Sequence, residues 1–277
     1  MICDVSLNLH LYDLTSDPLL RCNDGSPGGY YYREAVTAED DDKWNFFLQG
    51  GGWCWNVTSC NERILQNLLF GDGHLVTSTG WDPVRTVSAG IFLMEDSGWE
   101  NGHLVYVPYC SGDAHMGDTE EVTGDLGLIQ YRGRRMARAV VSKLVGKERT
   151  DQRILFGGTS AGGRGSMVLI DHLHDLVHDT TKIYGVHDSG AYQDIPPYDT
   201  SYTPFGDQCR QAYSMYQPPI SEECASLHED AWPCVCGEYM LPHVLTPSQV
   251  VLYLYDSYQL DQDLGSKPSH WTQEMCR

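Results

Sequence analysis

The sequence predicts an α/β fold built on a mostly parallel sheet with helices on both faces. Short apolar runs alternate with segments of helical periodicity along the chain, and glycine-rich or polar residues follow several of these runs. The runs are apolar throughout rather than at every second position, which is typical of parallel strands covered on both faces. A chain of 277 residues can bury one sizeable core, so we expect a single domain over residues 1–277.

The N-terminal half is expected to supply strands, turns and one helix. In order, they are a turn leading into a strand (Asp24–Tyr32), an acidic turn (Glu39–Lys43), a buried strand (Trp44–Gln49), a helix (Cys60–Phe70) and an apolar strand (His103–Pro108). The buried strand runs directly into Gly50-Gly51-Gly52-Trp53. This glycine-rich turn is therefore expected where the chain leaves the sheet.

The clearest helix is Tyr131–Val145, where apolar residues recur at helical spacing and basic residues occupy the other face. After it we expect, in order, a strand (Ile154–Phe156), a helix (Ser166–Val177), a strand (Lys182–Val186) and an apolar strand that ends at Asp256 (Val250–Tyr255). The stretch Gln193–Pro247 is rich in Pro, Tyr and Cys and has little periodicity. We therefore expect residues 193–247 to form a cap or insertion above the sheet.

The charge balance is acidic, with 38 Asp and Glu against 18 Lys and Arg and a formal net charge of -20. Nucleic acid is not an expected partner, because phosphate binding needs a basic face. No segment reaches the roughly 18 apolar residues that a membrane-spanning helix needs. We therefore expect a globular protein without a membrane span.

Ten cysteines are many for a protein of a reducing compartment, and Cys209, Cys224, Cys234 and Cys236 cluster in one region. Zinc binding is the competing explanation, but Cys234-Val-Cys236 is tighter than the usual ligand spacing of a zinc site. Disulfides in a secreted protein are the favoured interpretation, and no metal is expected. The sequon Asn56-Val-Thr58 agrees with secretion as a glycosylation site at Asn56.

A Gly-x-Ser-x-Gly motif is the strongest chemical signal of the chain. Gly158, Ser160 and Gly162 follow the strand Ile154–Phe156 and precede a helical segment. A serine at such a strand–turn–helix junction has a strained backbone that exposes its hydroxyl, and the N–H groups of the helix start favour a developing anion. We therefore expect Ser160 to be the nucleophile of an acyl-transfer reaction.

Acyl transfer also needs oxyanion donors, a base and an acid that orients the base. The N–H groups of Gly52, Trp53 and Ala161 are the candidate donors, because a glycine-rich turn after a strand presents such groups in lipases and esterases. Asp256 lies downstream of the serine and is the candidate acid, although an aspartate there can also serve as a helix N-cap. Asp188 is the competing acid.

The base is the gap in this constellation. His270 is the only histidine after Asp256. His115, His187 and His243 precede the acid and break the order Ser, Asp, His that is usual for the fold class. We expect most of the eleven histidines to be surface or structural residues.

Seven segments together resemble the pectin acetylesterase/Notum family of carboxylesterases. They occur in the family's order over most of Cys22–Leu260: Asp24-Gly-Ser-Pro27, Leu48–Asn56 with Ser59-Cys60, Tyr109-Cys-Ser-Gly-Asp113, Tyr131-Arg-Gly-Arg134, Gly158–Gly163, Asp188-Ser-Gly190 and Tyr255-Asp-Ser-Tyr-Gln259. The resemblance implies an α/β-hydrolase-like fold with Ser160 as nucleophile, Asp256 as triad acid, and Gly52, Trp53 and Ala161 as oxyanion donors. It also implies a Cys54–Cys60 disulfide.

The family's triad histidine lies well beyond the acid in a cysteine-containing segment, so the resemblance does not assign that role to His270. Met1–Leu20 also lacks the basic start and unbroken apolar core of a signal peptide. We expect a signal peptide upstream of Met1 and a reading frame that continues past Arg277 to the missing histidine. Because a serine without a base is a poor nucleophile, the 277-residue chain alone is expected to be nearly inactive.

The expected function is that of a secreted serine carboxylesterase that removes O-acyl groups, above all acetyl, from a glycan such as pectin, without a cofactor. The alternatives are a Notum-like deacylase of an acylated protein and an inactive homologue that binds acylated glycan or protein. The net charge of -20 opposes binding to a polyanionic galacturonan unless local basic residues such as Arg164 contribute.

Overall fold

The computed structural model describes residues 4–71, 73–87, 97–123 and 126–263. The strands in these residues are β1 Val5–Leu11, β2 Gly29–Arg33, β3 Lys43–Leu48, β4 Val84–Val87, β5 His103–Val107, β6 Thr119–Thr123, β7 Gly127–Tyr131, β8 Arg153–Thr159, β9 Lys182–Asp188 and β10 Ser248–Val251. Eight of them form one sheet in the order β10-β9-β8-β3-β5-β2-β1-β4, and β6 pairs with β7 in a separate hairpin.

The sheet is parallel over its larger part and antiparallel at one edge. The pairs from β10 across β9, β8 and β3 to β5 are all parallel. The pairs β5–β2, β2–β1 and β1–β4 are antiparallel. In a parallel sheet the residues that follow the strands gather at one end, which is where ligands bind in such folds.

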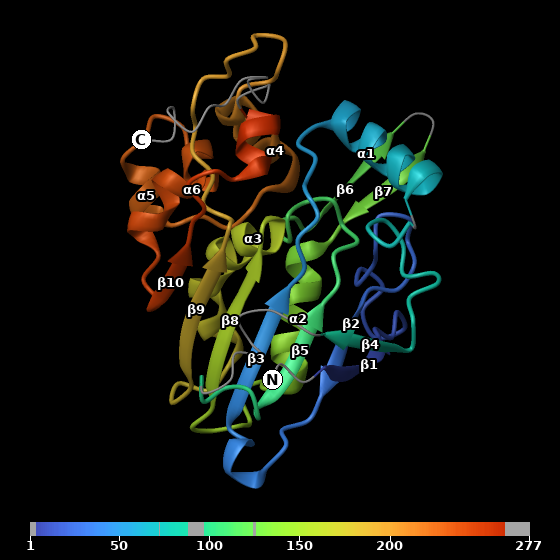
Figure 1. Cartoon of the computed structure of the whole chain (residues 1–277), viewed down its shortest axis with the longest axis vertical. Helices are drawn as coiled ribbons and strands as arrows, with labels where there is room; N and C mark the ends of the chain where they lie inside the picture. Colours follow the sequence, from blue (N-terminus) through green and yellow to red (C-terminus); the bar gives the residue numbers. More distant parts are fainter. Residues whose placement is uncertain (1–3, 72, 88–96, 124–125, 264–277) are drawn as a thin grey trace.

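Helices lie between and beyond these strands. They are α1 Val57–Phe70, α2 Gly133–Leu144, α3 Ala161–Leu169, α4 Phe205–Tyr216, α5 Glu222–Ser226, α6 Gly237–Met240, the short 3₁₀ segments η1 Ala38–Asp40, η3 Ile170–Leu176, η4 Trp232–Val235 and η5 Leu241–His243, and the π-helical turn η6 Gln259–Asp263. Figure 1 shows α1, α4 and α6 at the end of the sheet toward which the parallel strands point, with α2 and α3 along one of its faces.

Two apolar clusters lie on the two faces of the sheet. Along β8, Ile154 and Phe156 belong to the larger cluster, which also contains residues of α1, α2, α3 and the 193–247 segment. Leu155 points the other way, into a smaller cluster formed by strand residues and Trp99. Within the described residues, the helices that contribute to these clusters all pack on the first face, whereas helices on both faces were expected from the sequence. None of the described helices is long and apolar enough to cross a membrane.

The strand expected over Val250–Tyr255 is wrong in its bounds. β10 begins at Ser248 and ends at Val251, and the four residues after it are more than half exposed, Leu254 to 93%. β10 is the edge of the sheet and pairs only with β9, so no second strand holds the apolar run in an extended conformation. Apolar composition alone could not show where this strand stops.

Other expected elements hold with shifted ends. The expected helix over Tyr131–Val145 begins only at Gly133, because Tyr131 is the last residue of β7. The helix after the serine begins earlier than expected, at Ala161, and continues as the 3₁₀ segment η3 to Leu176. β1, β4, β6 and β7, and the helices within 193–247, were not predicted individually.

Each cysteine of the described residues is in a disulfide, which agrees with the expected oxidised state. The pairs are Cys22–Cys110, Cys54–Cys60, Cys209–Cys236 and Cys224–Cys234. The last two lie inside the 193–247 segment, where they cross-link short helices that have little core of their own. The pair Cys54–Cys60 is the one implied by the family resemblance.

Candidate active site

Ser160 lies at a strained turn between β8 and α3. Its backbone has φ 55° and ψ -121°, in the left-handed region that residues other than glycine rarely adopt. Its N–H donates to the Asp188 carbonyl at 2.8 Å, and its carbonyl accepts from the Arg164 N–H at 2.9 Å. A Cβ at Gly162 would lie 2.0 Å from the Leu48 carbonyl oxygen, so only glycine lets α3 approach β3 this closely. The motif therefore forms the expected elbow.

The glycine-rich turn after β3 lies beside this elbow. Gly52 has φ 70°, a conformation that favours glycine. Among the described residues, the N–H groups of Gly52 and Trp53 have no hydrogen-bond partner. The next N–H, that of Cys54, donates to the Gly112 carbonyl at 3.0 Å. The turn is thus fixed at Cys54 while the two preceding N–H groups stay available to a ligand.

The 193–247 segment also holds this turn in place. The Tyr216 hydroxyl at the end of α4 donates to the Cys54 carbonyl at 2.8 Å and lies 3.2 Å from Cys54 Sγ. Cys54 is joined to Cys60 on α1. The donors expected for an oxyanion are therefore attached to a disulfide and to a buried tyrosine before any substrate binds.

One small cavity brings the expected nucleophile and donors together. Its volume is about 10 Å³, and it is lined by Gly52, Trp53, Ala114, Ser160, Ala161, Arg164, Tyr192 and Tyr258. Such a volume accommodates about one water molecule. The structure thus places Ser160, Gly52, Trp53 and Ala161 around one cavity.

Asp256 lies near this cavity but not at a strand end. It follows β10 by five residues, and its Oδ1 accepts the N–H groups of Tyr258 and Gln259 at 2.9 and 3.0 Å. The N-cap role considered from the sequence is therefore realised. The pKa of Tyr192 is raised to about 12, mainly by burial, and the negative charge of Asp256 contributes to the rise. Since Tyr192 contacts Ser160, this carboxylate lies within electrostatic range of the serine.

Asp188, the competing acid, has less free capacity. Its Oδ1 accepts from the Ser189 hydroxyl at 2.9 Å and its Oδ2 accepts from the Thr159 hydroxyl at 3.2 Å. Among the described residues, the Asp256 side chain accepts hydrogen bonds at Oδ1 and not at Oδ2. Asp256 can therefore accept a further donor such as an imidazole N–H, whereas Asp188 already holds one hydroxyl on each oxygen.

None of the histidines in the described residues contacts Ser160. His115 Nε2 lies 2.9 Å from the Gln49 carbonyl oxygen, and His187 bonds the Ser166 and Ser248 hydroxyls at 2.7 and 3.2 Å. Burial lowers the pKa of each of these two imidazoles to about 4. Both are neutral structural residues, as expected. His270 lies outside the described residues.

The structure adds site residues that the sequence did not single out. The Tyr192 hydroxyl lies 3.1 Å from Ser160 Oγ, and the Tyr192 ring lies 5.1 Å from that of Tyr258. Asp263 is buried at 1% exposure, and neither of its oxygens has a hydrogen-bond partner among the described residues. The available signal was positional: Tyr192 follows the end of β9 by four residues, close to the end of the sheet where Ser160 lies.

The buried Asp263 gives the site a pH-dependent stability. Burial raises the pKa of Asp263 to about 8. The charge of Arg164 lowers this pKa by a smaller amount, and the charges of Asp256 and Asp194 raise it slightly. The folded protein therefore keeps a proton that the unfolded chain releases above about pH 4. Stability is expected to fall as pH rises from about 4 to 8, by at most about 1.4 kcal/mol per pH unit.

Asp263→Asn removes this ionisation. The free energy of unfolding of the variant minus that of the wild type should be larger at pH 8 than at pH 5, because only the wild type loses stability as the pH rises. Chemical denaturation at both pH values measures the difference, and Asp179→Asn on the surface serves as the control. An equal effect of Asp263→Asn at both pH values would contradict the raised pKa.

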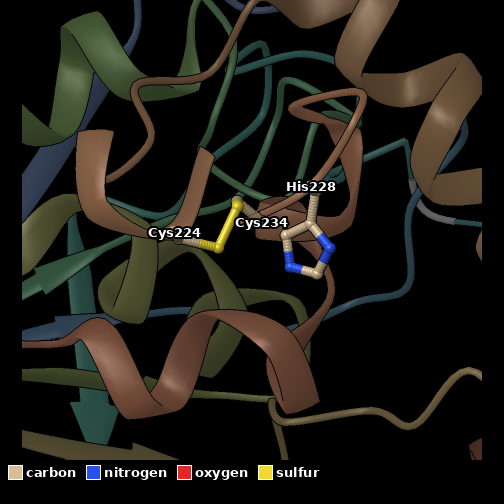
Figure 2. Close-up of side chains that lie close together, drawn as sticks. All are labelled: Cys224, His228 and Cys234. Atoms are coloured by element: carbon tan, nitrogen blue, oxygen red, sulfur yellow. A yellow bond between two sulfur atoms is a disulfide. The ribbon is translucent and has the colours of Figure 1, made fainter. Parts of the chain in front are cut away.

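A second cluster of ligand-type residues lies in the 193–247 segment. Cys224, His228 and Cys234 present ligand atoms within 4.8 Å of one another. Figure 2 shows that the two cysteines form a disulfide beside the imidazole of His228. Metal binding by cysteine requires thiolates, so these residues in their disulfide form do not make a zinc site.

Asn56 has a structural role in addition to its sequon. Its Oδ1 accepts the Ser59 N–H at 2.8 Å and caps α1, and its Nδ2 donates to Gln211 Oε1 at 2.7 Å. The side chain thereby connects α1 to α4. Glycosylation at Asn56 stays a prediction.

A serine at a strained elbow, facing free N–H groups of a glycine turn beyond the ends of parallel strands, defines an α/β-hydrolase-like protein. The profile described as pectinacetylesterase matches residues 4–277. The chain therefore belongs to the pectinacetylesterase family.

The chain is similar to palmitoleoyl-protein carboxylesterases named Notum. It is 33% identical to the Drosophila melanogaster protein over 262 residues, which is 90% of this chain and 38% of that protein. It is 30% identical to the mouse protein over 273 residues, or 93% of this chain and 52% of that protein. This chain thus spans about four-tenths to half the length of these curated relatives.

The fold matches a solved structure of the same kind. The 1.9 Å structure of the Wnt deacylase Notum from Drosophila aligns with a TM-score of 0.82 and 28% sequence identity, covering 96% of this chain and 77% of that chain. The α/β-hydrolase-like fold and the family predicted from the sequence are confirmed.

Proposed function

We propose that the full-length protein containing this chain is a secreted serine carboxylesterase that removes O-acetyl groups from a glycan such as pectin. The observation that carries the proposal is the cavity shared by Ser160 and the N–H groups of Gly52, Trp53 and Ala161. Membership of the pectinacetylesterase family and similarity to palmitoleoyl-protein carboxylesterases support ester hydrolysis. The four disulfides support secretion.

In the proposed reaction Ser160 Oγ attacks the ester carbonyl carbon and its proton passes to a histidine oriented by Asp256. The carbonyl oxygen becomes an oxyanion that accepts hydrogen bonds from the three N–H groups. Collapse of this intermediate breaks the bond to the alcohol oxygen of the glycan, which leaves with the proton from the histidine. Water then hydrolyses the acyl-serine by the same route, releasing the acid and restoring Ser160.

The size of the cavity supports a short acyl group. A volume of about 10 Å³ beside Ser160 suits a methyl group and not an extended hydrocarbon chain. The relatives are named for a palmitoleoyl substrate on a protein, and such a chain needs a much larger pocket. We therefore place acetyl ahead of long-chain acyl groups and a glycan ahead of a lipid-modified protein as the acceptor.

Two assays on the full-length protein test this function. We expect turnover of p-nitrophenyl acetate, and release of acetate from acetylated pectin but none from pectin deacetylated beforehand. Turnover of palmitoleoylated peptide in preference to acetylated pectin would replace the proposal with the protein-deacylase alternative. Hydrolysis of neither substrate by a folded full-length protein would contradict both.

The second candidate is a catalytically inactive homologue that binds acylated glycan or protein. It is motivated by the finding that no histidine in the described part of the chain contacts Ser160. It predicts binding of acetylated pectin without release of acetate, which isothermal titration and acetate analysis together distinguish from turnover.

The assignment of the triad acid makes a paired prediction. Asp256→Asn should lower kcat by about a thousandfold or more, because an amide holds the histidine in the wrong tautomer. Asp188→Asn, which changes the neighbouring carboxylate, should cost less than about tenfold. Steady-state kinetics with p-nitrophenyl acetate measure both, and the reverse order of effects would assign the triad acid to Asp188.

A further inference from the structure

Arg164 is a buried cation in the wall of the Ser160 cavity. It lies one helical turn after the serine and is 1% exposed. Its guanidinium carbon lies 3.6 Å from the centroid of the Trp53 ring and 4.9 Å from that of Phe205. Its Nη2 donates to Cys209 Sγ at 3.2 Å and to the Val235 carbonyl at 3.3 Å. The side chain is thus held by two aromatic faces and by the 193–247 segment.

The buried carboxyl of Asp263 lies within electrostatic range of Arg164 but forms no hydrogen bond with it. Burial lowers the pKa of Arg164 to about 10, which leaves it charged at neutral pH. Among the described residues, no carboxylate forms an ion pair with it, and its Nε has no hydrogen-bond partner. The aromatic rings of Trp53 and Phe205 contribute to stabilising the charge, since a cation over a ring face is attracted more strongly where water is absent.

This guanidinium forms part of the wall of the cavity beside Ser160. An ester whose carbonyl oxygen accepts from the donors Gly52, Trp53 and Ala161 would place the start of its acyl chain at the cavity that these residues line. Arg164 and Tyr258 line the same cavity, which has room for little more than a methyl group. A longer chain would have to displace a side chain that is packed on both sides and would bring hydrocarbon against a buried charge.

We propose that Arg164 sets the acyl-length limit of the Ser160 site, restricting it to acetyl and other very short acyl groups. This inference rests on the proposed esterase function and assigns its specificity to one side chain. The limit depends on the 193–247 segment, because Cys209 and Val235 hold the guanidinium over the Trp53 ring. Arg164 is a specificity residue in this account, with no part in bond breaking.

The test compares kcat/KM for the p-nitrophenyl esters of acetate, butyrate and octanoate in the full-length protein. The wild type should prefer acetate to octanoate. Arg164→Ala and the somewhat larger Arg164→Val should raise the octanoate-to-acetate ratio by about a hundredfold, because pocket contacts with a few methylene groups are worth this much. Arg164→Met, which fills a similar length without the charge, should leave the ratio within about tenfold of the wild type.

A binding measurement gives the same answer without turnover. Millimolar octanoate should raise the melting temperature of Arg164→Ala but not of the wild type, while acetate serves as the control ligand. If the wild type hydrolyses no ester but octanoate stabilises only Arg164→Ala, the proposed function fails and the length limit stands. If folded Ala and Val variants keep the wild-type ester ratio, or octanoate stabilises the wild type equally, the inference on Arg164 is wrong.

Discussion

Replacing Ser160 with alanine is expected to lower kcat for acetate-ester hydrolysis by about a thousandfold or more in the full-length protein. Alanine removes the hydroxyl that forms the acyl intermediate but leaves the N–H groups of Gly52, Trp53 and Ala161 in place. The residual rate should therefore be that of an oxyanion site without a nucleophile. Steady-state kinetics with p-nitrophenyl acetate measure this loss.

Ser142→Ala, on an exposed position of α2, is the matched control and should stay within about twofold of the wild-type kcat. Circular dichroism of both variants checks that they fold. Retention of more than about a tenth of the wild-type kcat by Ser160→Ala would show that another residue carries the reaction.

Asp113→Ala is expected to cause the largest loss of stability among single changes near the site. Asp113 is fully buried and accepts four hydrogen bonds, from the Ser111 hydroxyl and from the N–H groups of His115, Gly117 and Gly133, at 2.6 to 3.1 Å. Burial raises its pKa to about 6 and these hydrogen bonds oppose the rise. It is therefore ionised at neutral pH and serves as a shared acceptor.

Alanine leaves three buried N–H groups without an acceptor, and each unsatisfied group costs about 1–3 kcal/mol of folding stability. A loss of about 3–6 kcal/mol is a large part of the stability of an ordinary domain. The melting temperature should fall by roughly 10 °C. Asp179→Ala, an exposed aspartate, is the control and should change stability by less than about 0.5 kcal/mol. A melting temperature of Asp113→Ala within about 2 °C of the wild type would contradict the role of Asp113 as shared acceptor.

The Asp113 network also connects stability to the site. Its loop carries Gly112, whose carbonyl accepts the Cys54 N–H, and Ala114, which lines the Ser160 cavity. Part of the motif Tyr109-Cys-Ser-Gly-Asp113, singled out from the sequence by resemblance, therefore has a physical role. The Gly112 carbonyl of this motif holds the glycine turn through its hydrogen bond with the Cys54 N–H.

Most of the parallel part of the fold could be predicted because its strands are short, continuous apolar runs. β3, β5, β8 and β9 lie where such runs predicted them, within a few residues. The antiparallel edge was harder, since β1 mixes polar and apolar residues in a segment, Val5–Leu11, that has no clear turn before it. The end of β10 could not be predicted because its run of apolar residues continues beyond the last paired position.

The geometry of the candidate site can be read from the sequence where a backbone motif defines it, but not where packing defines it. Ser160 and the Gly52 turn have signatures of local sequence, since glycine spacing dictates both conformations. Tyr192 and Asp263 reach the site only through the tertiary fold, and nothing in their own segments marks them. Arg164 was visible as a charge beside the motif, but its stacking on Trp53 and Phe205 depends on residues far apart in the sequence.

The claim that Ser160 is the nucleophile of an esterase is tested most directly by covalent labelling. The full-length protein is treated with a fluorophosphonate, digested with trypsin and mapped by mass spectrometry. We expect the label on the peptide of residues 154–164, at Ser160, with loss of p-nitrophenyl acetate hydrolysis in proportion to labelling. Loss of hydrolysis with this peptide unmodified, or full hydrolysis with Ser160 completely labelled, would contradict the account.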